Sequence, residues 1–235
     1  MVSDPGRQVA LALRAAAGSL DDAAFAKLTE SPASQVDGAR QLGAGVLDAP
    51  TEPAWRRYTG VVHGAASPST LSTPQRTRFR RHLGYVSALA GLVFADEPLP
   101  AYRLPMGANL APVGPLAGFW RDRVEARLAH HLAPGAKLWV LTGGEYERAL
   151  GVPPGMQSVE VSFVEDKGGG RDGSPPSAAL KQARGTLARF LAQLPGAGRS
   201  PDGKAWDGVT FHAGLRDFHL ADATGTSQLW RATPS

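Results

Sequence analysis

The sequence predicts a mixed α/β fold: one domain with a mixed central sheet flanked by helices and preceded by a helical N-terminal segment. Strand-like and helix-like segments alternate irregularly, no internal repeat is present, and 43% of the 235 residues are hydrophobic, which is enough for a substantial core. We therefore treat residues 1–235 as a single domain. A helical hairpin-like segment occupies 19–43, and a sheet-and-helix body occupies 55–231.

Three helices are predicted at the N-terminus. Apolar residues form a stripe over 6–17. The next helix begins at Ser19, which can cap it, and extends to about Glu30; its two aspartates fall in the first turn, where the helix dipole favours them. Ser31-Pro32 ends it, and a third helix covers about 33–43.

The middle of the chain mixes strands and helices. Residues 55–65 suit a short strand or a strand–helix junction, and 85–94 form an apolar run typical of a buried strand. Ser72-Thr-Pro74 opens a helix with proline in its first turn, and 116–132 form an amphipathic helix. The first of these helices is basic: it carries Arg76, Arg78, Arg80, Arg81 and His82.

The last hundred residues complete the predicted sheet. A buried strand covers 137–142, a second, alternating strand covers 158–164, and one or two strands lie in 209–231. Between them, residues 178–194 form the clearest amphipathic helix. The Gly/Pro-rich segment after the second strand, 165–177, is a loop or hairpin tip.

Composition limits the function classes. The net charge of +4 and pI near 9.7 permit an anionic partner without requiring one, and a GC-rich genome explains the arginine and alanine content equally well. The absence of cysteine excludes disulfides, thiolate metal sites and cysteine nucleophiles. No apolar run is long enough to span a membrane and no secretory signal is evident, so we expect a cytoplasmic protein without membrane contact.

The stretch LPAYRLPMGANL places one guanidinium, Arg103, among Tyr102, Leu104 and Met106. A partly buried charge is costly unless it is paired. Arg103 therefore either holds the fold through a carboxylate or binds an anionic ligand. We expect Glu145 to be its resting partner, with the salt bridge opening when an anion arrives.

Gly143, Gly144, Glu145 and Tyr146 follow a predicted strand and open a short helix. Ligands of α/β sheets collect beyond the carboxyl ends of strands, and two glycines leave backbone N–H groups free for an anion. Glu145 is a candidate general base as well as a partner for Arg103; the pattern favours the salt bridge.

Lys181 and Arg184 lie three residues apart on one helix face, next to Gly185. They form either an anion site or an ordinary solvated face. Glycine inside a helix costs about 1 kcal/mol relative to alanine, so Gly185 predicts close approach of another backbone or a ligand.

Other motifs point to structure. His63 is expected to be structural, and His130-His131 suit a helix C-terminus better than a metal site. The sequence has no Walker loop, dinucleotide fingerprint or Gly-x-Ser-x-Gly elbow, and we predict neither cofactor nor metal.

Two specific stretches, Tyr-Arg-Leu-x-Met-Gly at 102–107 and Lys-x-Ala-Arg-Gly at 181–185, carry a family resemblance. In the order and spacing of its motifs, the chain resembles the YaaA-type peroxide-stress protein family from about residue 20 to the end. Further matching stretches are Y-T-G-V-V-H at 58–63, S-A-L-A-G at 87–91, E-Y at 145–146, F-V-E-D-K at 163–167 and L-W-R at 229–231.

The resemblance implies a cytoplasmic, monomer-sized α/β protein with a positively charged cleft that limits iron-dependent damage during peroxide stress. It also implies DNA binding with a helix–hairpin–helix-like element, which falls at 19–43 here. Four features depart from the family pattern: the initial Ser-Pro-Ala-Lys-like motif is not found, Pro105 replaces an acid, Val61 and His63 replace an aspartate and a tyrosine, and Gly144 replaces asparagine or aspartate.

These residues and the resemblance lead to two alternative hypotheses of function. The first is binding of DNA or another anion by a monomer associated with oxidative stress, through Tyr102, Arg103, Gly143, Gly144, Tyr146, Lys181 and Arg184. The second is an enzyme of specialised metabolism that acts on a small carboxylate or phosphate, with Glu145 moving a proton and Lys181 assisting. A silent ligand-binding or scaffold protein is a third reading. In all of them, Arg103, Glu145, Lys181 and Arg184 are predicted to converge in one pocket.

Overall fold

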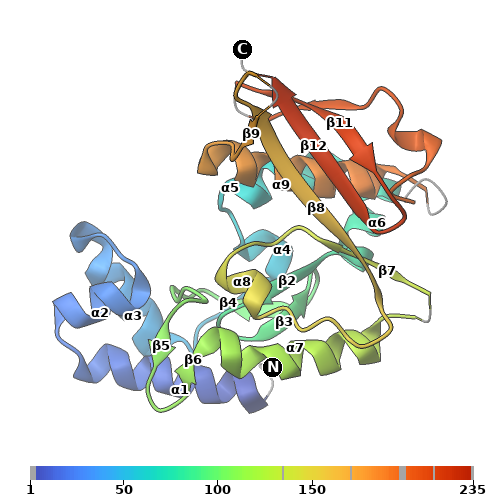
Figure 1. The fold of residues 1–235 in the computed structure, drawn as a ribbon. Helices are drawn as coiled ribbons and strands as arrows, with labels where there is room; N and C mark the ends of the chain where they lie inside the picture. The colour runs from blue at the N-terminus through green and yellow to red at the C-terminus, as the bar shows by residue number, and fades with distance from the viewer. Residues whose placement is uncertain (1–3, 134, 170, 196–199, 214, 234–235) are drawn as a thin grey trace. The chain divides into compact units, whose positions relative to one another are not determined.

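A computed structural model describes residues 4–133, 135–169, 171–195, 200–213 and 215–233. The chain divides into two compact units (Figure 1). The first contains Met1–Arg57, Gly84–Leu132 and Gly143–Pro153, and the second contains Tyr58–Leu83, Ala133–Thr142 and Pro154–Ser235. The predicted mixed α/β fold with a helical N-terminal segment is confirmed, whereas the single-domain organisation stays a prediction.

The helical N-terminal segment of the first unit closely follows the prediction. It consists of α1 (Asp4–Ser19), α2 (Asp22–Thr29), a 3-10 turn (Ala33–Gln35) and α3 (Val36–Gly45). The predicted cap at Ser19 is wrong because α1 extends to that residue. Asp21 caps α2 instead, and its carboxylate accepts the N–H of Ala24 at 2.8 Å.

Close packing joins α1 to α3. A Cβ atom on Gly43 of α3 would lie 3.2 Å from the Cβ of Ala17 and 3.3 Å from the ring of Phe25. Arg40 of α3 also donates to the carbonyl of Ala17 near the end of α1 and to Asp22 at the start of α2. The three helices therefore form one packed layer.

A hairpin replaces the single buried strand expected at 85–94. β2 (Gly84–Ser87) pairs antiparallel with β3 (Gly91–Phe94) around a tight turn. The apolar pattern was correct, but Gly91 has a φ of 71°, a conformation that allows the chain to reverse. Trp120 packs over Gly91, and its indole N–H donates to the carbonyl of Ala88 at 2.8 Å.

The rest of the first unit consists of short elements around a long helix. The predicted helix at 116–132 is confirmed as α7 (Leu116–His131), with Leu116, Trp120, Val124 and Leu128 buried. The short elements are β1 (Thr51–Pro53), α4 (Ala54–Arg57), β4 (Pro98–Pro100), β5 (Asn109–Leu110), β6 (Gly114–Pro115) and α8 (Glu145–Arg148), with β1 paired to β4 and β5 to β6.

The second unit contains the main sheet, in the order β10-β11-β12-β8-β7, with β9 paired to β8. β12, β8 and β7 are parallel, and β10, β11 and β12 are antiparallel, so the sheet is mixed as predicted. Its strands are β7 (Lys137–Val140), β8 (Gln157–Asp166), β9 (Asp172–Gly173), β10 (Thr210–His212), β11 (Asp217–Ala223) and β12 (Ser227–Thr233).

The predicted helix at 178–194 is α9 (Ser177–Gln193), and it covers one face of this sheet (Figure 1). Ala183 and Leu187 of α9 pack against Phe163 of β8 and Trp230 of β12 in the core of the unit. Trp206 closes this core, 5.2 Å from the ring of Phe190 and 5.4 Å from that of Trp139.

Two shorter helices, α5 (Val61–Ala66) and α6 (Thr73–His82), complete the second unit. The strand expected within 55–65 is wrong, because the described backbone there is helical at α4 and α5. The helix opened by Ser72-Thr-Pro74 is confirmed: Ser72 and Gln75 form a capping box at the start of α6.

Gly185 of α9 faces α5, and the expected close approach of another backbone is confirmed. A Cβ atom there would lie 2.0 Å from the carbonyl oxygen of Val62 and 2.8 Å from the Cβ of Ala65. No side chain fits at that distance. The glycine of the Lys-x-Ala-Arg-Gly stretch therefore sets the spacing between two helices.

Candidate functional site

The loop from Tyr102 to Gly107 follows β4 and is anchored on both sides of Arg103. Leu104 and Met106 are 5% and 0% exposed. The hydroxyl of Tyr102 lies 2.9 Å from the hydroxyl of Ser87, which is completely buried at the end of β2. Because its neighbours are fixed in this way, Arg103 has little freedom to leave its position.

Arg103 bonds to a neutral group. Its Nη2 donates to the main-chain carbonyl of Glu30 at 2.9 Å, and its Nε is buried without a hydrogen-bond partner. Glu30 ends α2 with a φ of 49°, the left-handed conformation of a helix C-cap. In the described part of the chain, Arg103 makes no ion pair, so its charge is not neutralised.

The resting pair expected between Arg103 and Glu145 is wrong. Glu145 forms its ion pair with Arg148, one turn further along α8. Residues three apart on a helix are neighbours, so this local pair forms without any long-range contact. The carboxylate stem of Glu145 nevertheless borders the Arg103 loop, because a Cβ atom on Gly107 would lie 3.2 Å from its Cγ.

Gly143 and Gly144 lead into α8 as predicted. Gly144 has φ 61° and ψ −131°, a combination that favours glycine, and this turns the chain into the helix. Since α8 has only four residues, its dipole is small. Anion binding by these two glycines stays a prediction.

Tyr146 lies next to the same loop and is 39% exposed. Burial raises the pKa of its phenol, and the nearby Tyr102 and Glu30 raise it further, while a hydrogen bond to the backbone of Met106 lowers it. Tyr102, Tyr146, Glu30 and Arg103 therefore form one cluster within the first unit.

Lys181 and Arg184 lie on α9 in the second unit. Lys181 is exposed and Arg184 is half-buried. Between them, the Oε1 atom of Gln182 is buried without a hydrogen-bond partner. Convergence of these residues with Arg103 and Glu145, and the catalytic roles of Glu145 and Lys181, stay predictions.

Two of the basic residues that favoured anion binding have structural partners instead. Arg78 of α6 donates to the carbonyls of Ala192 and Gln193 at the end of α9, at 2.9 and 3.1 Å. Arg189 donates to the carbonyl of Ser67, beyond the end of α5, at 2.8 Å. Both satisfy carbonyls that a helix C-terminus leaves open.

The histidines also have structural surroundings. His63 stacks on Tyr58, with ring centroids 5.1 Å apart, and burial lowers its pKa to about 4. It is therefore neutral at physiological pH. His131 stacks on Phe94 in the last turn of α7, with ring centroids 3.6 Å apart. Among the described residues, no group of three or more His, Cys, Asp or Glu side chains is arranged to hold a metal ion.

Sequence reasoning missed Glu30, Ser87 and Arg148 as members of this cluster. Glu30 contributes a main-chain carbonyl, which no side-chain motif reveals. Ser87 lies 15 residues before Tyr102 and meets it only because the β2–β3 hairpin folds back. Arg148 was detectable, since its spacing from Glu145 is that of an ion pair on a helix.

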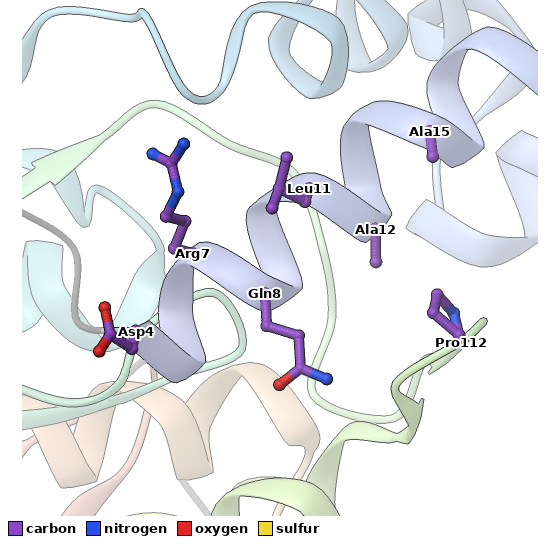
Figure 2. Close-up of a pocket in the computed structure, with 7 residues that line it drawn as sticks. All are labelled: Asp4, Arg7, Gln8, Leu11, Ala12, Ala15 and Pro112. Carbon is purple, nitrogen blue, oxygen red and sulfur yellow. The ribbon is translucent and has the colours of Figure 1, made fainter.

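A groove of about 430 Å³ lies elsewhere in the first unit, along α1 (Figure 2). Leu11, Ala12 and Ala15 line it together with Pro112 of the β5–β6 turn, and Asp4, Arg7 and Gln8 border its N-terminal part. Its lining is almost entirely apolar, so the groove shares neither residues nor chemistry with the Arg103 cluster.

Comparison with known proteins gives a consistent result. A family model described as "Peroxide stress protein YaaA" matches residues 9–195. A UPF0246 protein of Ruegeria sp. (strain TM1040) is 31% identical over 180 residues, 73% of this chain and 66% of the relative. Others from Methylibium petroleiphilum and Corynebacterium efficiens are 33% and 34% identical over 148 residues each, 60% and 63% of this chain and 56% and 57% of theirs.

The chain thus spans about two thirds or less of the length of these relatives. None of the helices in the described part of the chain is long and apolar enough to cross a membrane.

Proposed function

The chain belongs to the YaaA family of peroxide stress proteins, and we propose that it serves the oxidative stress response by binding DNA or another anionic ligand at Arg103. The proposal rests on the hydrogen bonding and burial of the Arg103 guanidinium. Arg103 is half-buried, and among the described residues its one hydrogen bond is to a neutral carbonyl and its buried Nε has no acceptor.

Energetics favour a ligand for this group. A buried donor without a partner costs about 1–3 kcal/mol, and a partly buried charge adds to that cost. An anion at Nη1, the guanidinium nitrogen that is neither buried nor hydrogen-bonded in the described part of the chain, balances the charge of Arg103. Arginine suits this task because its planar fork can bind two oxygens of a carboxylate or phosphate.

The other predicted contacts extend the site. Tyr102 and Tyr146 belong to the same cluster as Arg103, and the Gly143-Gly144 turn precedes Tyr146. Anion binding by Lys181 and Arg184, on α9 of the second unit, is part of the proposal. A positively charged cleft in a monomeric, cytoplasmic protein is part of this proposal.

A binding titration tests it. We would measure affinities at low salt for the parent and for Arg103→Lys. Fluorescence anisotropy measures binding of duplex, single-stranded and branched DNA, and calorimetry measures binding of inorganic phosphate. Because lysine keeps the charge but loses the fork, we expect affinity to fall at least about tenfold. DNA affinity should also fall steeply with salt, because binding releases counterions.

Arg14→Lys is the matched control. Arg14 is an exposed arginine on α1 whose ion pair with Asp48 is long, at 3.9 Å. It should leave affinity unchanged. If no anion binds the parent at low salt, or if both variants bind like the parent, Arg103 is not an anion site.

A further inference from the structure

Two opposite charges lie side by side at Arg103 without neutralising each other. The guanidinium bonds to the main-chain carbonyl of Glu30, at 2.9 Å, and not to its carboxylate. Glu30 is exposed, and in the described part of the chain its carboxylate makes no ion pair. That Arg103 meets the carbonyl of Glu30 has a cause in the backbone.

The cause is the cap of α2. The N–H of Glu30 bonds to the carbonyls of Ala26 and Lys27, and the residue has the left-handed conformation of a helix end. The next N–H, of Ser31, bonds to Ala26 at 3.0 Å. The backbone therefore presents the Glu30 carbonyl to Arg103, and it fixes the Cα atom from which the carboxylate extends into solvent.

Comparison with other arginines of the chain shows what Arg103 lacks. Arg231 uses Nε and Nη2 together on the two carboxylate oxygens of Asp172, at 2.9 and 2.8 Å. Arg216 directs the same two nitrogens at one oxygen of Glu165, both at 2.8 Å. Arg103 has only Nη2 occupied. Because Nε is buried, a ligand reaches the guanidinium at Nη1, where a single oxygen atom that carries negative charge would fit.

The surroundings limit the charge of the ligand. Glu30 contributes one negative charge, and Glu145, already paired with Arg148, lies at Gly107. A doubly charged phosphate would be attracted by one cation and repelled by Glu30. A ligand with one carboxylate and one ammonium group would instead meet a favourable partner at each end, with no net charge to bury.

We propose that this site binds a free α-amino acid, whose carboxylate contacts Arg103 and whose ammonium group contacts the Glu30 carboxylate. The proposal rests on the proposed function, because it specifies the anion that Arg103 takes. The half-exposed Tyr146 and the neighbouring Tyr102 would border the ligand and contact its side chain.

The test uses the full chain and the twenty proteinogenic L-amino acids, each measured by thermal shift and by calorimetry. For each amino acid that binds, two analogues follow: the acid without the amine and the amine without the carboxylate (propionate and ethylamine in the case of alanine). We expect at least one amino acid to raise the melting temperature and both of its analogues to bind at least tenfold more weakly.

Glu30→Gln removes the charge but keeps the main-chain carbonyl that Arg103 uses. It should therefore fold normally and weaken binding of the amino acid about tenfold to a hundredfold, as for loss of a charged hydrogen bond, whereas binding of the carboxylic acid analogue should stay equal or become slightly stronger because the repulsion by Glu30 is gone. Asp37→Asn, at an exposed acid in the first turn of α3, is the matched control and should change neither.

The outcomes separate the two proposals. If DNA, phosphate or propionate binds in an Arg103-dependent way and no amino acid binds better than its acid analogue, this inference is overturned and the proposed function stands. If amino acids bind equally to the parent and to Glu30→Gln, the inference is also wrong. If no anion or amino acid depends on Arg103, both proposals fail.

Discussion

Glu165 in the second unit and Arg103 in the first are both charges with limited access to solvent, and their surroundings differ completely. The side chain of Glu165 is 4% exposed, but Lys167 bonds to one of its oxygens at 2.6 Å and Arg216 to the other at 2.8 Å. Arg103 has one neutral acceptor, and its buried Nε has none. The charge of Glu165 is satisfied within the fold, whereas that of Arg103 is not, which is why we propose a ligand for Arg103.

The same difference applies to the basic residues in general. Arg78 and Arg189 contribute to the pI but are used on helix ends. Counting cations therefore overestimates the surface that an anion can meet. Among the described residues, asking which cation has a buried donor without an acceptor selects Arg103.

The largest effect is expected where the second unit is most tightly filled, at Gly185. Because an added Cβ atom would meet the backbone oxygen of Val62 at 2.0 Å, Gly185→Ala should destabilise the protein by about 3 kcal/mol or more, in a urea titration. Gly64→Ala, in the facing helix with open space around it, is the control and should be neutral or stabilising. Equal stability of the two variants would mean that the helices are not in close contact.

The second-largest effect is expected on replacing the partner of Glu165, and the change in melting temperature should depend on pH. Hydrogen bonds from Lys167 and then Arg216 lower the pKa of this carboxyl below its ordinary value of about 4.3. Its contribution to stability is therefore present above that value and is lost as the pH falls through the lower, folded-state value. Arg216→Gln should lower the melting temperature at neutral pH, and the difference from the parent should shrink in acid.

A pH-independent difference in melting temperature would show that Arg216 acts by packing alone. Glu165→Gln should also lose the acid-dependent part, because it has no proton to gain. Measuring both variants from neutral pH down to pH 3 separates the charge from the contact.

Replacing Arg103 should have a much smaller effect on the free protein. Arg103→Met loses one hydrogen bond and at the same time removes an unsatisfied buried donor and an unbalanced charge, so we expect its unfolding free energy to stay within about 1 kcal/mol of the parent. The substitution leaves no carboxylate unpaired at Glu145, because that residue pairs with Arg148. A loss of more than about 3 kcal/mol in chemical unfolding would make Arg103 a structural residue.

The smallest effect is expected at Tyr146. Burial raises the pKa of its phenol, so the folded state binds the proton more tightly than the unfolded chain does. The contribution of Tyr146 to stability is then fully present below about pH 10, and it is lost as the pH rises towards the higher pKa of the folded state. Tyr146→Phe should lose slightly less stability than the parent between pH 9 and 11. An identical alkaline limb in the two proteins would contradict the raised pKa.

The sequence predicted the secondary structure best where the spacing of apolar residues fits only one kind of element. The stripes of α1, α7 and α9 repeat at helical spacing, and the alternation in β8 has the period of a strand. It predicted poorly where an apolar run fits two structures. Residues 85–94 form a hairpin because Gly91 permits a turn, and Val61–Ala66 form a helix although two valines favour a strand.

The site shows the same limit. Arg103, Tyr102 and Tyr146 were recognisable from their own residue types, and the structure brings them together in the first unit. The hydrogen-bond partner of Arg103 was not recognisable from the sequence, because it is a main-chain carbonyl presented by the cap of α2. The expected Glu145 partner was lost to a local competitor, Arg148, which no long-range argument considers.

Gly144 limits how this protein can change over evolutionary time. Its φ of 61° and ψ of −131° are accessible to glycine and strained for other residues, by about 1–3 kcal/mol. The resemblance to the family implies asparagine or aspartate at this position. Gly144→Asn and Gly144→Asp would each impose that strain on the loop. The asparagine or aspartate of the family pattern therefore cannot be placed here without a change in the path of the loop.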